Sequence, residues 1–240
     1  MPRARLSCLL IVSACLAVSG CGGLVPDGEP GVRPPASGTA SASRQRPAIG
    51  SPSQPSAGQN SASPACLADL GASGARFSPL PDSYGARGCN QLGTVQLSTV
   101  AGDYSQFGIS NIGALKCSVA QTFSGWARFG VDRAARQILG SPIARIETMG
   151  SYACRNVAGT SRRSAHARAA AIDVSGFVLE DGRRIVLKSD WNGGTAAERE
   201  FLRVVHRSAC KRFGTVLGPD YNRAHADHFH LEGSGGKFCR

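Results

Sequence analysis

The feature that most constrains this chain is a change of composition near residue 65. From Gly22 to Ala65 the sequence consists mainly of Pro, Ser, Gly and Ala, with few charges and almost no large apolar side chains. Such a segment buries too little apolar surface to offset the entropy lost on ordering. The sequence therefore predicts a flexible tether over residues 21–65. We therefore expect the folded domain to comprise residues 66–240, a length sufficient for one domain with its own core.

Residues 1–20 have the pattern of an export signal. Arg3 and Arg5 precede an apolar run, Leu6–Val18, which is too short to span a bilayer. The run ends in Val-Ser-Gly-Cys21, which resembles the lipobox of bacterial lipoproteins. We therefore expect export, cleavage before Cys21 and a lipid on its thiol, which anchors the domain to the bacterial cell envelope, in the periplasm or on the outer cell surface. The alternative is an ordinary signal peptide that ends beside a cysteine.

The use of cysteine agrees with export. Of nine cysteines, two lie in the signal segment and Cys21 is the expected lipidation site. An even number then remains in an exported domain, which predicts three disulfides that staple both of its ends, with the pairing left open. The six are Cys66, Cys89, Cys117, Cys154, Cys210 and Cys239.

The chain is basic. Its formal charge of +11 falls to +9 when Arg3 and Arg5 are removed. No nucleic-acid-binding motif is present, so nucleic acid is not an expected partner. An anionic envelope polymer or a membrane surface suits this charge, although solubility alone explains it equally well.

Hydrophobic periodicity predicts an α+β domain, in which helices pack on an antiparallel sheet. His206 falls on one of the predicted helices without a ligand-type neighbour, so we expect it to be structural. The expected helices are 115–129, 131–139 and 196–213. The expected strands are 95–100, 142–149, 172–179, 183–188 after an Asp181-Gly182 turn, and 215–217.

Three of the five histidines lie in one hexapeptide, His225-Ala-Asp-His-Phe-His230. On a strand, His228 and His230 share one face and Phe229 takes the other. Two imidazoles beside a carboxylate suit a divalent metal, although a polar surface strand has the same pattern. His166 and Asp173 are the candidates for the remaining ligands, since a catalytic zinc usually has three protein ligands.

These residues also resemble a known family. Ser164-x-His166-x6-Asp173 and the later histidine pair are similar to the SxHxxGxAxD and terminal histidine signatures of zinc D-alanyl-D-alanine peptidases. Murein endopeptidases and the hedgehog signalling domain share the fold of those enzymes. The closer resemblance is to the bacterial extensin-like C-terminal domain family of the same superfamily, and it covers most of residues 66–240. It rests on Gly150-Ser-Tyr-Ala-Cys-Arg155, Ser164-x-His166-Ala, Ala171-Ile-Asp173, Phe201-Leu202, Cys210, Phe213-Gly214, Leu217-Gly-Pro-Asp-Tyr-Asn222, His225 and Asp227-His-Phe-His-Leu231.

Carried over residue by residue, the resemblance implies Zn²⁺ as cofactor, with His166, Asp173 and His230 as its ligands. Two positions depart from the family patterns. Ala169 replaces a glycine, which is tolerable at negative φ but strained at positive φ. Ala165 stands where many extensin-like domains have an acidic residue. Both departures bear on activity more than on the fold.

The resemblance also implies catalytic roles. His228 and Asp227 are alternative general bases, and Asp227 is also a candidate to orient a histidine. Arg155 suits a developing oxyanion or a substrate carboxylate. The expected substrate-facing residues are Tyr152, Ser164 and His225. Tyr152 and Arg155 have the alternative role of packing and pairing near Cys154.

The leading hypothesis is a lipid-anchored, zinc-dependent hydrolase of peptidoglycan stem peptides, of the D,D-carboxypeptidase or the murein endopeptidase type. A second hypothesis is a non-catalytic, zinc-containing module of the same fold that binds peptidoglycan or an envelope partner. A third is an envelope protein held by disulfides without a metal. The sequence leaves open whether the protein is an enzyme, which bond it cleaves and its oligomeric state.

Overall fold

A computed structural model of the protein describes residues 59–233 and 236–240. The predicted export signal, the lipidation site at Cys21 and the predicted tether as far as residue 58 lie outside the described residues. No helix within the described ranges is long and apolar enough to cross a bilayer.

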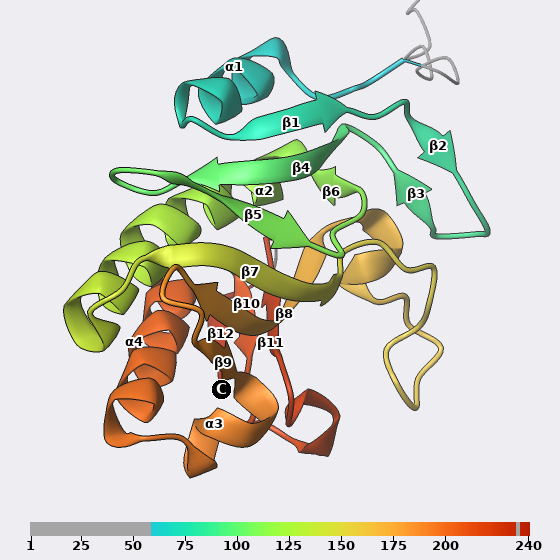
Figure 1. Ribbon diagram of the computed structural model, residues 1–240. Helices are drawn as coiled ribbons and strands as arrows, with labels where there is room; N and C mark the ends of the chain where they lie inside the picture. The colour runs from blue at the N-terminus through green and yellow to red at the C-terminus, as the bar shows by residue number, and fades with distance from the viewer. Residues whose placement is uncertain (1–58, 234–235) are drawn as a thin grey trace, which may run out of the picture. The chain divides into compact units, whose positions relative to one another are not determined.

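In the described part of the chain, ten strands form one sheet in the order β1-β4-β5-β7-β8-β11-β10-β12, with β6 paired to β4 and β9 paired to β8 (Figure 1). Most neighbouring strands are antiparallel, as predicted, but β5 pairs with β7 and β10 with β12 in parallel. The sheet is therefore mixed. Its strands are β1 Arg76–Pro79, β4 Thr94–Ala101, β5 Gln106–Ser110, β6 Leu115–Lys116, β7 Ile143–Gly150, β8 Ala171–Leu179, β9 Arg184–Val186, β10 Thr215–Leu217, β11 Phe229–Glu232 and β12 Phe238–Cys239. A separate ribbon pairs β2 Ser83–Tyr84 with β3 Asn90–Gln91.

The core lies between this sheet and two helices, α2 (Cys117–Trp126) and α4 (Ala196–Arg212). Trp126 is fully buried, its ring is 6.3 Å from the rings of both Phe177 and Phe213, and its indole N–H donates to the carbonyl oxygen of Val205. The α-helices are α1 Pro64–Ala72, α2 Cys117–Trp126, α3 Leu187–Gly193 and α4 Ala196–Arg212. The long α4 begins at a capping box of Thr195 and Glu198, which satisfies backbone N–H groups at its first turn.

The helical segment after β6 is longer than either helix predicted there. It starts at Cys117 and continues through two π-helical stretches, η1 Ala127–Asp132 and η2 Ala135–Leu139. It ends at Gly140, whose φ of 73° is a left-handed conformation that favours glycine. Residues 117–139 therefore form one helical element, which directly follows the two-residue strand β6.

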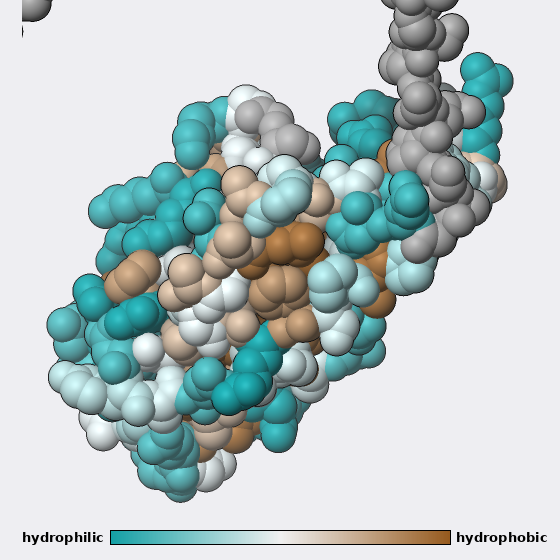
Figure 2. All heavy atoms as spheres, turned by 90° about the horizontal axis from the view of Figure 1, so that it is seen from above, coloured by the Kyte–Doolittle hydropathy of each residue, from teal (hydrophilic) through white to brown (hydrophobic). Residues whose placement is uncertain are grey.

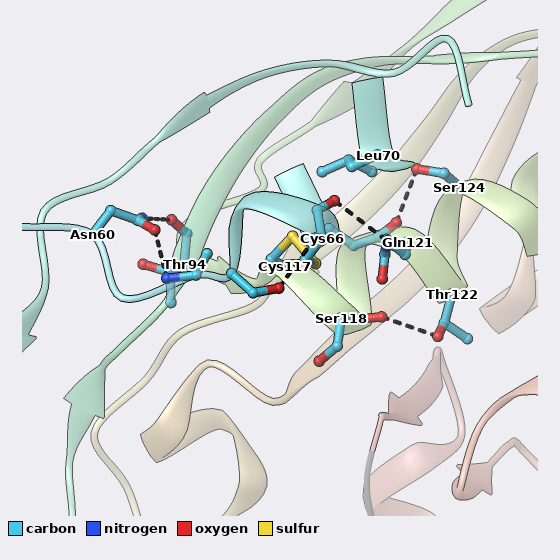
Figure 3. Close-up of a disulfide and its surroundings, with 12 residues drawn as sticks. Asn60, Cys66, Leu70, Thr94, Cys117, Ser118, Gln121, Thr122 and Ser124 are labelled. Atoms are coloured by element: carbon cyan, nitrogen blue, oxygen red, sulfur yellow. Dashed lines mark hydrogen bonds between the residues drawn. A yellow bond between two sulfur atoms is a disulfide. The ribbon is translucent and has the colours of Figure 1, made fainter. Parts of the chain in front are cut away.

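Contacts with the domain begin before residue 66, the boundary that composition predicts. The side-chain amide of Asn60 donates to the carbonyl oxygen of Thr94 at 2.6 Å (Figure 3) and to that of Leu80 at the same distance. Ser63 caps α1 through its hydroxyl.

Viewed from the side of α1 and β1, apolar side chains gather near the middle of this face and hydrophilic ones surround them (Figure 2).

The six cysteines form three disulfides, as predicted, and both ends of the domain are stapled. Cys66–Cys117 joins α1 to the start of α2, where the Gln121 amide also donates to the Cys66 carbonyl oxygen (Figure 3). The other bridges are Cys89–Cys154 and Cys210–Cys239.

Replacing Cys89 and Cys154 together with serine should lower the free energy of unfolding by about 3–4 kcal/mol. The bridge closes a sequence separation of 65 residues, and a cross-link of that span removes much entropy from the unfolded chain. Equilibrium urea unfolding of the variant and the wild type measures the difference. An unchanged unfolding midpoint would contradict a stabilising role for this bridge.

Candidate metal centre

The side chains of His166, Asp173 and His230 converge at one point. His166 Nε2 lies 3.1 Å from His230 Nδ1, and Asp173 Oδ1 lies 3.2 Å from the former atom and 2.8 Å from the latter. Zinc with ligand bonds of about 2.0–2.1 Å in a tetrahedron separates its ligand atoms by about 3.3–3.4 Å. The three donor atoms are therefore spaced much like three corners of a zinc tetrahedron, and all three side chains are buried.

Two strands of the sheet place Asp173 and His230. In the pairing of β8 with β11, Asp173 lies directly opposite His230. Phe229 and Leu231, on either side of His230, are fully buried in the core, so the alternation of the strand turns His230 to the other face.

A register shift gives Asp173 the same orientation. The pairing of β7 with β8 shifts between Glu147 and Thr148. In an uninterrupted strand Phe177 would lie on the face opposite to Ile172 and Val174, because side chains alternate. The register shift adds one residue to β8 between them, so that all three side chains are buried in the core. Asp173 points away from that core and toward the two histidines.

A hydrogen bond fixes the orientation of His166, which lies on the short 3-10 helix η3, Ala165–Arg168. Its Nδ1–H donates to the Ser151 carbonyl oxygen at 2.6 Å. The Ser151 hydroxyl in turn donates to the Ala114 carbonyl oxygen, which ties this position to the start of β6. The lone pair of His166 Nε2 therefore faces Asp173.

Glu232 orients His230, and sequence reasoning missed it. His230 Nε2–H donates to Glu232 Oε1 at 2.9 Å, so Nδ1 is the nitrogen that faces Asp173. The sequence does contain a signal for Glu232: it lies two residues after His230 on β11, a spacing that puts both side chains on one face of the strand. A carboxylate behind a metal-binding histidine is a common way to fix its tautomer.

The arrangement of His166, Asp173 and His230 is stable only with a positive charge between their facing atoms. The N–H groups of His166 and His230 point away from the centre, to Ser151 and Glu232. Two imidazole lone pairs and a carboxylate therefore face one another at about 3 Å, which is repulsive unless a metal ion or a proton lies between them. Burial disfavours the charged form of His230, but its hydrogen bonds to Asp173 and Glu232 raise its pKa to about 9. Burial likewise disfavours the Asp173 carboxylate, yet the two imidazoles beside it, those of His166 and His230, hold its pKa well below its usual range.

Replacing Glu232 with glutamine should weaken zinc binding about tenfold, because the amide keeps an acceptor oxygen for His230 but loses the negative charge. Competition for zinc with a chromophoric chelator measures the affinity. Glu180→Gln is the matched control, since the Glu180 carboxylate is exposed and accepts from the Ser105 hydroxyl. Equal affinity of Glu232→Gln and the control would contradict the role of Glu232.

A cavity of about 480 Å³ opens above the centre. His228 lies between the cavity and Asp173, with Nε2 at 3.8 Å from Asp173 Oδ1. Its Nδ1–H donates to Asp227 Oδ1 at 2.9 Å. The lining residues are Arg155, Val157, Ala158, Arg162, Ser164, Thr215, Leu217, Tyr221, Asn222, Ala224, His225, His228, His230, Glu232 and Phe238.

Arg155 and His225 also line this cavity. Arg155 is half-exposed, with Nη2 at 3.8 Å from Asp173 Oδ2. His225 lies on η4, Arg223–His225, where Nδ1–H donates to the Asn222 side-chain oxygen at 2.7 Å. Burial lowers the pKa of His225 to about 4, with further repulsion from His228 and His230, so His225 is neutral at neutral pH.

The other predicted site residues take different places. Ser164 lines the cavity, and its hydroxyl accepts from the His166 N–H as the cap of η3. Tyr152 is not among the lining residues, and its hydroxyl lies beside Gly85, next to the β2–β3 ribbon. His206 does lie near two cysteines, Cys210 and Cys239, but their sulfur atoms are bonded to each other. It packs against Trp191 and Phe229, which agrees with the structural role expected for it.

Ala169 has a φ of 51°, the strained case for the alanine that replaces the family glycine. It follows η3 directly, and its carbonyl oxygen accepts from the Lys116 N–H at 2.8 Å. The backbone that positions His166 therefore carries a left-handed residue with a buried methyl group.

Replacing Ala169 with glycine should raise the free energy of unfolding by up to about 1 kcal/mol. Glycine avoids the Cβ clash of this conformation, which costs about 1–2 kcal/mol, and its greater freedom in the unfolded chain offsets part of the gain. Chemical denaturation measures the change. Ala167→Gly, within η3, is the control and should lose stability, so a loss in both variants would contradict strain at Ala169.

Together, these features define an α+β protein with a buried centre of two histidines and one aspartate at the floor of a cavity. The family model described as "Extensin-like protein C-terminus" matches residues 64–240. The chain therefore belongs to the extensin-like C-terminal family. No curated protein and no solved structure is significantly similar to it.

Proposed function

We propose that this protein is a zinc-dependent hydrolase of peptide bonds in peptidoglycan, of the D,D-carboxypeptidase or the murein endopeptidase type. The observation that carries the proposal is the convergence of His166, Asp173 and His230, with their donor atoms 2.8–3.2 Å apart, beneath a cavity. The SxHxxGxAxD-like motif supports the link to zinc D-alanyl-D-alanine peptidases and to the fold that they share with the hedgehog domain.

The residues present fit zinc. Two imidazole nitrogens and a carboxylate are a usual ligand set for catalytic zinc, and the open cavity leaves room for water and substrate. A zinc ion held there supplies Lewis acidity, which activates water for attack on an amide carbonyl.

The surrounding side chains supply the remaining chemistry. His228, whose Nε2 faces Asp173 across 3.8 Å, accepts the proton of the attacking water and returns it to the leaving amine. Asp227 holds the His228 ring through Nδ1. The Arg155 guanidinium stabilises the negative charge that develops on the carbonyl oxygen.

We also propose that the protein is exported and anchored by a lipid on Cys21. The lipobox-like sequence before Cys21 supports this location, and the three disulfides suit an oxidising compartment. The domain then works on the peptidoglycan near the membrane that carries the lipid.

Metal analysis and turnover test the function together. The purified protein should contain one zinc ion per chain. Incubated with muropeptides, it should release D-alanine or cleave cross-links, and a chelator should stop the reaction until zinc is restored. A protein without zinc that also fails to rebind it would overturn the proposal. A zinc-loaded protein that binds sacculi without cleaving them would favour the non-catalytic module.

A further inference from the structure

The loop over residues 156–163 places one arginine, Arg162, in the cavity. Its ends are joined by a bridge between Asn156 and Arg163, and the Val157 N–H donates to the Arg162 carbonyl oxygen at 2.9 Å. Gly159, with a φ of 73°, lies at the turn. The loop is thus a small hairpin whose two sides contribute Val157 and Arg162 to the cavity lining.

Arg162 and Arg163 are neighbours in sequence but have different surroundings. The Arg163 guanidinium donates to the Arg87 carbonyl oxygen and to the Asn156 side-chain oxygen, and Arg163 does not line the cavity. Arg162 lines the cavity and has no carboxylate within ion-pair distance among residues 59–233 and 236–240. Arg163 therefore holds the hairpin together, whereas the charge of Arg162 has no protein partner there.

The cavity thereby has two guanidinium groups in different positions. Arg155 reaches to 3.8 Å from Asp173 and lies beside the candidate metal centre. Arg162 has no such contact with Asp173 and belongs to the hairpin wall. Glu232, an acidic residue that shares the lining, is already bound to His230.

We propose that Arg162 binds a carboxylate of the substrate at a distance from the bond that is cleaved, so that the cavity selects acidic peptides. A guanidinium is planar and binds a carboxylate through two parallel hydrogen bonds, which gives geometric selection as well as attraction. This inference rests on the proposed function, because it takes the candidate metal centre as the place of cleavage. It assigns Arg162 to substrate selection and leaves Arg155 to the reacting carbonyl.

Two synthetic peptides test this. Both end in D-Ala-D-Ala and are identical except that one carries a glutamate, and the other a glutamine, upstream of the scissile bond. Wild-type protein should cleave the glutamate peptide with a kcat/KM about tenfold higher, as expected for a charge-assisted hydrogen bond. Arg162→Gln should reduce this ratio to near one, with its zinc content unchanged.

Arg87→Gln is the matched control, since it removes the same charge from an exposed side chain that does not line the cavity and leaves the contacts of Arg163 in place. It should keep the wild-type ratio, which excludes a general effect of net charge. An unchanged ratio in Arg162→Gln would overturn the proposal, as would an equal loss in both variants.

The test also separates this inference from the proposed function. If neither peptide is cleaved, calorimetric titration of each peptide into the zinc-loaded protein measures its dissociation constant. The ratio of the two dissociation constants then replaces the ratio of the kcat/KM values. Preferential binding of the glutamate peptide that depends on Arg162 supports the inference even without turnover. Failure to bind either peptide would overturn it.

Discussion

Replacing His230 with alanine should lower the zinc affinity of the protein by roughly a thousandfold and abolish any zinc-dependent hydrolysis. His230 provides one of three donor atoms that lie 2.8–3.2 Å apart, and its loss leaves two ligands that grip a metal poorly. Competition with a chromophoric chelator measures the affinity, and metal analysis after gel filtration gives the stoichiometry.

His206→Gln is the control for this experiment. It also removes one imidazole, but from a position 5.3 Å, between ring centroids, from Phe229 on the core side of β11. The control should retain one zinc per chain. Thermal unfolding of His230→Ala beside metal-free wild type distinguishes loss of a ligand from loss of the fold. Wild-type zinc affinity in His230→Ala would mean that the metal binds elsewhere.

Elements with strong periodicity were predictable from the sequence. The strands expected over 142–149 and 172–179 correspond to β7 and β8, and the helix expected over 196–213 corresponds to α4. Each has an apolar face that the core requires, so the pattern and the final burial agree.

Two short helices escaped prediction because their sequences resemble other elements. The α1 sequence, Pro64–Ala72, is rich in alanine like the tether before it, and its stability depends on the Ser63 cap and on the Cys66 disulfide. The strand expected over 183–188 stops at Val186, where the Asp190 carboxylate accepts from the backbone N–H of Val186 and α3 begins. Neither contact is visible in a pattern of apolar residues.

The candidate site was predictable as a set of residues but not as an arrangement. The motif spacing identifies His166, Asp173 and His230. Their convergence depends on the neighbour order of β7, β8 and β11 and on the register shift that turns Asp173 toward the histidines. Strand order and register arise from long-range pairing, which local sequence does not encode.

The roles of His228 and Asp227 were left open by the sequence, and the geometry distinguishes them. His228 Nε2 lies 3.8 Å from Asp173 and faces the centre, whereas Asp227 contacts the opposite ring nitrogen. The Asp227 side chain is also the more exposed, at 43% against 10% for His228. We therefore expect Asp227 to act through His228 rather than directly on water.

Replacing His228 with alanine should accordingly reduce kcat about 10²- to 10⁴-fold, the usual contribution of a general acid–base residue. Zinc affinity should stay close to that of the wild type, because His228 is not one of the three converging ligands. Asp227→Asn should have a smaller effect on kcat, since the amide oxygen still accepts the His228 Nδ1–H. Steady-state kinetics with muropeptides, corrected for zinc content, measure both variants. A larger loss of kcat in Asp227→Asn than in His228→Ala would instead identify Asp227 as the base.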